Sequence, residues 1–152
     1  MIRLRATRRA PEHARDVLVI ESGAGKRVLE CWRQGLLPHE LFHAAVESVF
    51  PWRGFVRLVA AGRAPEDVGH RDALPETIWA EALTNALQAR HAGAIGPTDE
   101  ELRAYLAQIH PGALPQIAPA ALARVQERIL EWSARWAALS AGESLEITLD
   151  SG

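Results

Sequence analysis

Strict alternation of apolar and polar side chains occurs near both ends of this chain, whereas the long middle part has helical spacing. Residues 1–6 alternate with a period of two, and residues 144–150 repeat that pattern. Two further apolar runs, 16–21 and 27–32, flank the turn-type sequence Ser-Gly-Ala-Gly at 22–25. Alternation indicates half-buried strands, and two runs joined by such a turn predict a hairpin. We therefore expect a small antiparallel sheet to which the last strand returns, so that the two ends lie close together.

The middle of the chain predicts helices. Thr98 and Glu101 form a capping box, in which the Thr98 hydroxyl accepts from the Glu101 N–H and the Glu101 side chain returns to Thr98. A chain of 152 residues fits one domain. The expected fold is thus a single α+β domain over 1–152, with the sheet covered by about four helices. The helical segments are 37–50, a short 55–61, 75–91, the one that begins after Thr98, and the long 120–141.

Composition excludes several classes of protein. Lys and Arg total 17 against 19 Asp and Glu, a formal charge of −2, so binding to nucleic acid through bulk positive charge is not expected. No apolar run approaches the roughly 20 residues that span a bilayer, and no signal peptide is recognisable, so we expect a cytoplasmic protein without a membrane segment. Cys31 is the one cysteine, which rules out an internal disulfide, and we expect it to be a small buried hydrophobe.

One motif points to chemistry: residues 39–43 read His-Glu-Leu-Phe-His. On a helix the two histidines lie one turn apart, so both imidazoles can reach one metal ion, and Glu40 can take a proton from a bound water. A helical wheel places His39 at the margin of the apolar face and His43 nearer to solvent. The same wheel places Glu40 and Glu47 together on the polar side.

The motif also has an explanation without metal. His39 follows Pro38 at the start of the helix, where its ring can cap backbone donors. His43 can be a histidine at the edge of the core that is bonded to a carbonyl. Glu40 in the first turn interacts favourably with the helix dipole.

A second segment adds to the motif, because Glu81 and Asn85 share one face of the helix predicted over 75–91, with Gln88 continuing it. At this point the sequence resembles the gluzincin branch of zinc metallopeptidases. In that branch an H-E-x-x-H helix, often reading H-E-L-x-H-A, precedes a second helix that carries a glutamate ligand. The matching residues are His39, Glu40, Leu41, His43 and Ala44, followed by Glu81, Ala82, Leu83, Thr84 and Asn85.

The resemblance implies a set of roles. His39, His43 and Glu81 would be zinc ligands, and Glu40 would be the general base in hydrolysis of peptide bonds. Asn85 stands where the family commonly has an aspartate that orients a ligand histidine. The separation between His43 and Glu81 is longer here than in the best-known members.

Other residues could complete the site. His70, Asp72 or Glu76 could supply the third ligand in place of Glu81. His70, Arg71 and His91 are candidates for a group that stabilises the transition state.

Two functions of different class follow from these residues. The first is a zinc-dependent, zincin-like hydrolase that acts on peptide bonds. The second is a non-enzymatic interaction protein, such as a small adaptor or immunity-type binder with a peptide or protein partner, in which His39 and His43 serve only the structure. The third ligand and an open coordination position beside Glu40 distinguish the two, and the sequence does not give the oligomeric state.

Overall fold

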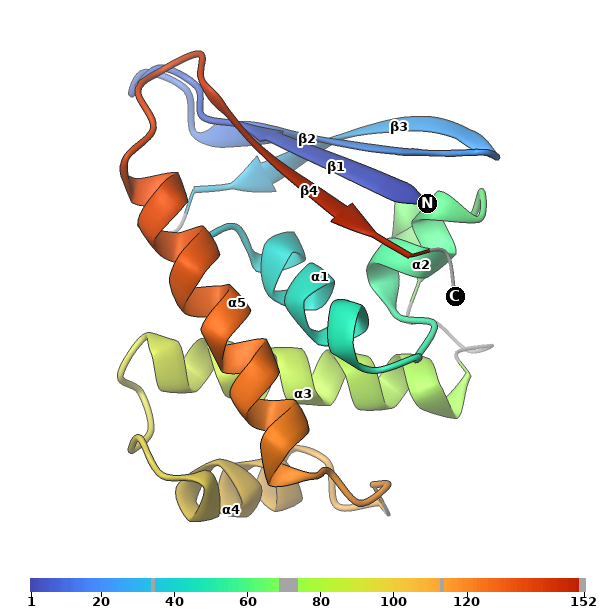
Figure 1. Ribbon diagram of the computed structural model, residues 1–152, viewed down its shortest axis with the longest axis vertical. Coiled ribbons are helices and arrows are strands. Elements are labelled where there is room, and N and C mark those ends of the chain that lie inside the picture. Colours follow the sequence, from blue (N-terminus) through green and yellow to red (C-terminus); the bar gives the residue numbers. More distant parts are fainter. Residues whose placement is uncertain (34, 69–73, 113, 151–152) are drawn as a thin grey trace.

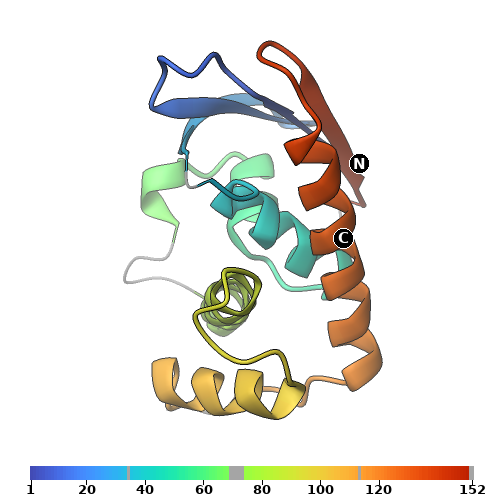
Figure 2. The ribbon, with the colours of Figure 1, turned by 90° about the vertical axis from the view of Figure 1, so that its left-hand side faces the viewer.

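Four antiparallel strands form one sheet, and the helices lie on one side of it (Figures 1 and 2). The computed structural model describes residues 1–33, 35–68, 74–112 and 114–150. The order of the strands is β3-β2-β1-β4. The last strand of the chain returns to the sheet, as expected, and there it pairs with the first strand. The strands are β1 (Ile2–Thr7), β2 (Arg15–Ser22), β3 (Gly25–Trp32) and β4 (Ser144–Leu149).

The register of the sheet places its apolar side chains in rows that face the helices. Leu4 of β1 lies opposite Ile20 of β2 and Ile147 of β4, and all three side chains are buried. Opposed residues in antiparallel strands project from the same face, which creates one apolar layer. Cys31 of β3 is buried in this layer, as expected.

Five α-helices are described, and their positions follow the predicted segments. Glu101 donates its backbone N–H to the Thr98 hydroxyl at 3.1 Å, which confirms the cap. The Thr98 hydroxyl in turn donates a hydrogen bond to the Glu101 carboxylate. None of the helices in the described part of the chain is long and apolar enough to cross a membrane. The helices are α1 (His39–Val49), α2 (Phe55–Ala60), α3 (Pro75–His91), α4 (Asp99–Ile109) and α5 (Pro119–Ala137), with a 3-10 turn, η1, at Pro65–Asp67.

Helix α1 lies at the centre of the molecule. It packs against α2, α3 and α5, and Figure 1 shows it between the sheet and α3. All seven residues from 41 to 47 are buried, because a neighbouring element covers each side of this part of the helix. The polar side chains in this stretch must therefore find their partners inside the protein.

Candidate metal centre

Helices α1 and α3 bring together His39, His43 and Glu81. The Nε2 atom of His43 lies 2.6 Å from Glu81 Oε2, and the Nε2 atom of His39 lies 3.9 Å from Glu81 Oε1. The two imidazole rings are 5.0 Å apart and nearly perpendicular. One donor atom from each of the three side chains lies within 4.8 Å of the other two, which is close enough for one ion to touch all three.

The three side chains form a gradient from the core to the surface. His43 is 3% exposed, His39 is 28% exposed and Glu81 is 51% exposed. The helical wheel placed His43 nearer to solvent than His39, and the structure shows the reverse. The reason is that α3 and Phe55 at the start of α2 cover the side of α1 that carries His43.

Polar partners hold the second nitrogen of both imidazoles. His39 Nδ1 is hydrogen-bonded to the side-chain oxygen of Gln88, one of the residues that continue the face of Glu81 on α3. His43 Nδ1 lies 3.4 Å from the Thr84 hydroxyl. An amide oxygen can only accept, so the Gln88 contact places the proton of a neutral His39 on Nδ1 and leaves a lone pair on Nε2. Metal-binding histidines are commonly fixed through their other ring nitrogen in this way.

Glu81 is held as a carboxylate. The hydrogen bond from His43 is the main reason that the pKa of Glu81 falls to about 2, while partial burial opposes this shift. The Asn85 side chain donates to Glu81 Oε1 at 3.3 Å. The resemblance places Asn85 at a position that orients a histidine, but in this structure it contacts the glutamate instead.

A residue that the sequence did not predict for the site, Glu47, lies behind His43. Its side chain is fully buried, and Oε2 is 3.8 Å from His43 Nδ1. Its carboxylate also accepts the backbone N–H groups of Val56 at 3.1 Å and Arg57 at 2.8 Å, at the start of α2. Burial raises the pKa of Glu47, and nearby His43 and these two donors oppose that shift. The sequence feature that could have indicated this contact is the i,i+4 spacing from His43 to Glu47, which puts both side chains on one side of α1.

Glu40 has a different neighbour. The Glu40 carboxylate lies near the thiol of Cys31 on β3, and burial of the thiol, followed by the charge of this carboxylate, raises the pKa of the thiol. Successive helical residues point roughly 100° apart, so the side chain after His39 leaves the face that carries the two histidines. Glu40 therefore lies on the side of α1 that faces the sheet.

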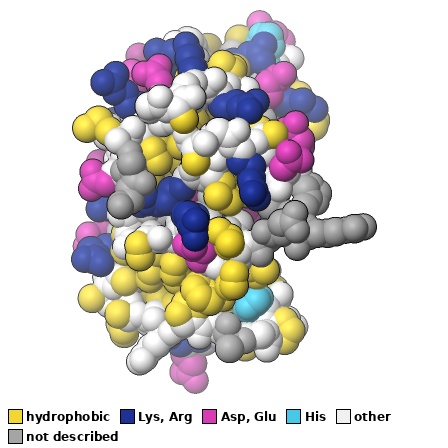
Figure 3. All heavy atoms as spheres, turned by 90° about the vertical axis from the view of Figure 1, so that its right-hand side faces the viewer, with side chains coloured by type: hydrophobic (Ala, Val, Ile, Leu, Met, Phe, Trp, Pro, Cys, Tyr) yellow, Lys and Arg dark blue, Asp and Glu magenta, His cyan; other side chains and the backbone are white. Residues whose placement is uncertain are grey.

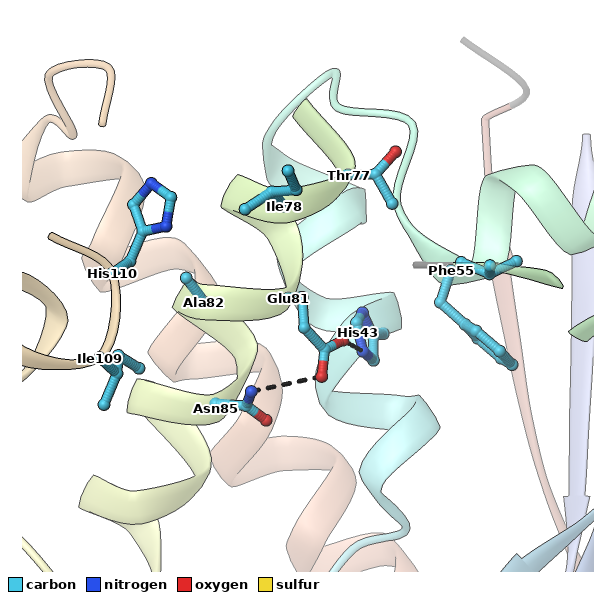
Figure 4. Close-up of a pocket in the computed structure, with 10 residues that line it drawn as sticks. His43, Phe55, Thr77, Ile78, Glu81, Ala82, Asn85, Ile109 and His110 are labelled. Atoms are coloured by element: carbon cyan, nitrogen blue, oxygen red, sulfur yellow. Dashed lines mark hydrogen bonds and ion pairs between the residues drawn. The ribbon is translucent and has the colours of Figure 1, made fainter. Parts of the chain in front are cut away.

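A pocket of about 400 Å³ opens beside His43 and Glu81 (Figure 4). Hydrophobic side chains gather in the lower half of the face shown in Figure 3, which is the side of the molecule that carries α2 and the start of α3. Ile78 and Ile109 are among the exposed large hydrophobic residues, and both line the pocket. The lining residues are His43, Phe55, Val68, Thr77, Ile78, Glu81, Ala82, Asn85, Ile109 and His110.

The other candidates from the sequence do not join this cluster. His70, Arg71 and Asp72 lie outside the described residues. Glu76 binds the Arg53 guanidinium at 2.8 Å and its backbone N–H at 2.7 Å. His91 packs against Phe42 and contacts Ser133. It follows Glu81 by ten residues on α3, which is a separation of about 15 Å along a helix.

No family model, curated protein or solved structure matches this chain. The chemistry of the centre can be judged from its donors. Two imidazole nitrogens and one carboxylate oxygen are a ligand set found in catalytic zinc sites, where a fourth position stays open for water or substrate.

Proposed function

We propose that the chain binds one zinc ion through His39, His43 and Glu81 and that this centre serves hydrolysis. The observation that carries the proposal is the convergence of two imidazole Nε2 atoms on one ionised carboxylate, while Gln88 and Thr84 occupy the Nδ1 atoms. The resemblance to gluzincins names peptide bonds as the substrate class.

The spacing of the donors fits this ion. Neighbouring ligand atoms of a tetrahedral zinc lie roughly 3.3 Å apart. The separations of His43 Nε2 from Glu81 Oε2, 2.6 Å, and of His39 Nε2 from Glu81 Oε1, 3.9 Å, end on different oxygens of the carboxylate and fall on either side of that value. Because half of the Glu81 side chain is exposed, a small rotation can even out the two separations without disturbing the core. Zinc in such a set supplies a Lewis acid that polarises a carbonyl and lowers the pKa of a bound water.

The remaining residues of the chain would position the centre and its substrate. Thr84 and buried Glu47 fix the ring of His43, and Asn85 fixes the Glu81 carboxylate. Phe55, Ile78 and the other apolar lining residues would receive an apolar side chain next to the centre and exclude water from it. Glu40 remains the general base that the resemblance implies, but its contact with Cys31 gives that role no support.

A second function keeps the same residues without a metal ion. In the interaction protein, the cluster would be a structural contact between α1 and α3. The 2.6 Å contact between His43 and Glu81 favours this alternative, because it pairs the imidazole with the carboxylate directly. The contact between Glu40 and Cys31 favours it as well.

The zinc content of the protein tests the proposal. We expect protein purified without a histidine tag to hold one zinc per chain, measured by mass spectrometry of the metal after dialysis. His39→Ala should reduce that content strongly, because it removes a ligand while the buried core remains intact. Zinc that is absent, or that His39→Ala leaves unchanged, would support the interaction protein instead.

The variant Glu40→Gln tests whether Glu40 is a zinc ligand or only lies next to the ligands in the motif. We expect this variant to keep its zinc, because the Glu40 carboxylate faces Cys31 rather than the three ligands. The amide has nearly the same size as the carboxylate and stays close to the thiol, so the free energy of unfolding should change by less than about 1 kcal/mol. Competition with a zinc chelator and a thermal melt measure the two quantities. A loss of zinc would place Glu40 among the ligands and contradict the assignment.

A further inference from the structure

Strand β3 is one edge of the sheet, and alternate residues along it direct their backbone groups away from β2, with no partner among the described residues. A two-residue turn joins β2 to β3, and Ser22 pairs with Gly25 across it. In such a hairpin the closing pair is hydrogen-bonded, and every second pair after it is hydrogen-bonded as well. The bond from Arg33 N–H to the Ala14 carbonyl continues this alternation. The N–H and C=O groups of the residues between these pairs, which include Lys26, Val28 and Glu30, therefore point away from the sheet.

The side chains of these residues lie on the outer face of the sheet, opposite the face that the described helices cover (Figure 2). Val28 is 62% exposed and lies directly opposite Val19 of β2 in the register. Lys26 and Glu30 stand on either side of Val28, each two residues away. The edge thus carries a positive charge, an apolar side chain and a negative charge in order.

We propose that a second copy of this chain pairs with β3 antiparallel, about a two-fold axis at Val28, to give one continuous eight-stranded sheet. In this register Val28 lies opposite its own copy, and Lys26 lies opposite Glu30 of the second copy in both directions. The same residues direct their N–H and C=O groups toward the second copy, so the backbone bonds and the charges are satisfied together. A two-fold contact of this kind closes on itself and leaves no further β3 edge.

The charges around the edge extend this complementarity. Lys26 lies opposite Glu21 within one chain, and Glu21 contacts Arg3 at 4.0 Å. Glu30 contacts Arg9 at 3.7 Å. Pairing of two β3 strands would therefore join two rows of alternating charge on the outer face. The apolar pair Val19 and Val28 would meet its own copy between these rows.

Other pairings lack this match. A shift of β3 by two residues against its copy removes the contact between Lys26 and Glu30, and a shift by four places Lys26 opposite Lys26 or Glu30 opposite Glu30. At the other edge, β4 bonds to β1 through the pairs that include Ala6 and Leu145, since the bond from Arg8 N–H to the Glu143 carbonyl sets the alternation. The outward-directed groups of β4 thus belong to Ser144, Glu146 and Thr148, and a central two-fold axis there would oppose two Glu146 carboxylates. Like charges in opposed positions destabilise a strand pair.

Charge reversal tests the register. We expect the unchanged protein to sediment at twice its 16.7 kDa chain mass at high micromolar concentration. Lys26→Glu and Glu30→Lys should each raise the dissociation constant of the dimer by at least about tenfold, because each creates two repulsive pairs. Mixing the two variants should restore a dimer, since every opposed pair is then Glu with Lys. The double variant Lys26→Glu/Glu30→Lys should dimerise by itself.

Two further variants keep the proposal falsifiable. Val28→Pro removes one outward N–H that no β2 bond uses, so it should abolish the dimer while circular dichroism shows an intact fold. Glu127→Lys, an exposed position on α5, should leave the dimer unchanged. A protein that stays monomeric at every concentration would overturn the proposal. So would a dimer that survives both charge reversals, or single variants that fail to associate when mixed.

Discussion

Glu81→Ala is expected to lower the affinity of the protein for zinc by on the order of 100-fold or more, since loss of a supporting group alone costs roughly 10- to 100-fold. Glu81 is the one carboxylate among the described residues that approaches both His39 and His43. Its removal leaves two imidazoles on one helix, without the carboxylate that α3 contributes to the centre. Competition with a chelating dye of known affinity measures the change.

The matched control removes a carboxylate elsewhere. Glu127 is an exposed glutamate on α5, and Glu127→Ala should leave zinc affinity within about twofold of the unchanged protein because surface carboxylates act only through screened charge. Full zinc affinity in Glu81→Ala would reject the assignment of the third ligand. His70 and Asp72, which lie outside the described residues, would then be the remaining candidates for the third ligand.

The fold could be predicted from the sequence because apolar residues recur with a different period in its strands and in its helices. The alternation at residues 1–6 and 144–150 identified β1 and β4, and the turn at 22–25 joined the other two strands. The prediction for 75–91 matches α3 at both ends, where Pro75 begins the helix and Gly93 follows it. The long helix ends at Ala137 rather than 141, because residues 139–143 turn back toward β1 and Gly142 donates its N–H to the Arg8 carbonyl.

The candidate site could be predicted from the sequence only in part. The spacing of His39 and His43 and the resemblance at Glu81 gave the three residues that the structure brings together. A helical wheel shows which residues share a side of α1, but it does not show which element covers that side. It therefore missed the burial of Glu47 against α2 and the contact between Glu40 and β3. These placements depend on contacts between segments far apart in the sequence, which periodicity does not encode.

Glu47→Ala is expected to lower the free energy of unfolding by about 3–5 kcal/mol, because it removes one member of a buried group of charges and donors. The substitution leaves the N–H groups of Val56 and Arg57 without an acceptor inside the protein, and each such loss costs roughly 1–3 kcal/mol. The loop before α2 also fits closely against this side chain: a Cβ atom added at Gly54 would lie 2.7 Å from Glu47 Cδ. Loss of the carboxylate therefore leaves a gap as well.

Glu47→Gln is the control that separates the hydrogen bonds from the charge. The amide keeps the shape of the side chain and one acceptor oxygen, so we expect a smaller loss of about 1–2 kcal/mol. For a chain of this size, the loss in Glu47→Ala should lower the melting temperature by about 10 °C. Urea unfolding followed by circular dichroism measures both variants without metal, so the result does not depend on the zinc proposal. A loss below 1 kcal/mol in Glu47→Ala would show that water or a rearranged loop replaces the carboxylate, and that Glu47 does not anchor α2 beside His43.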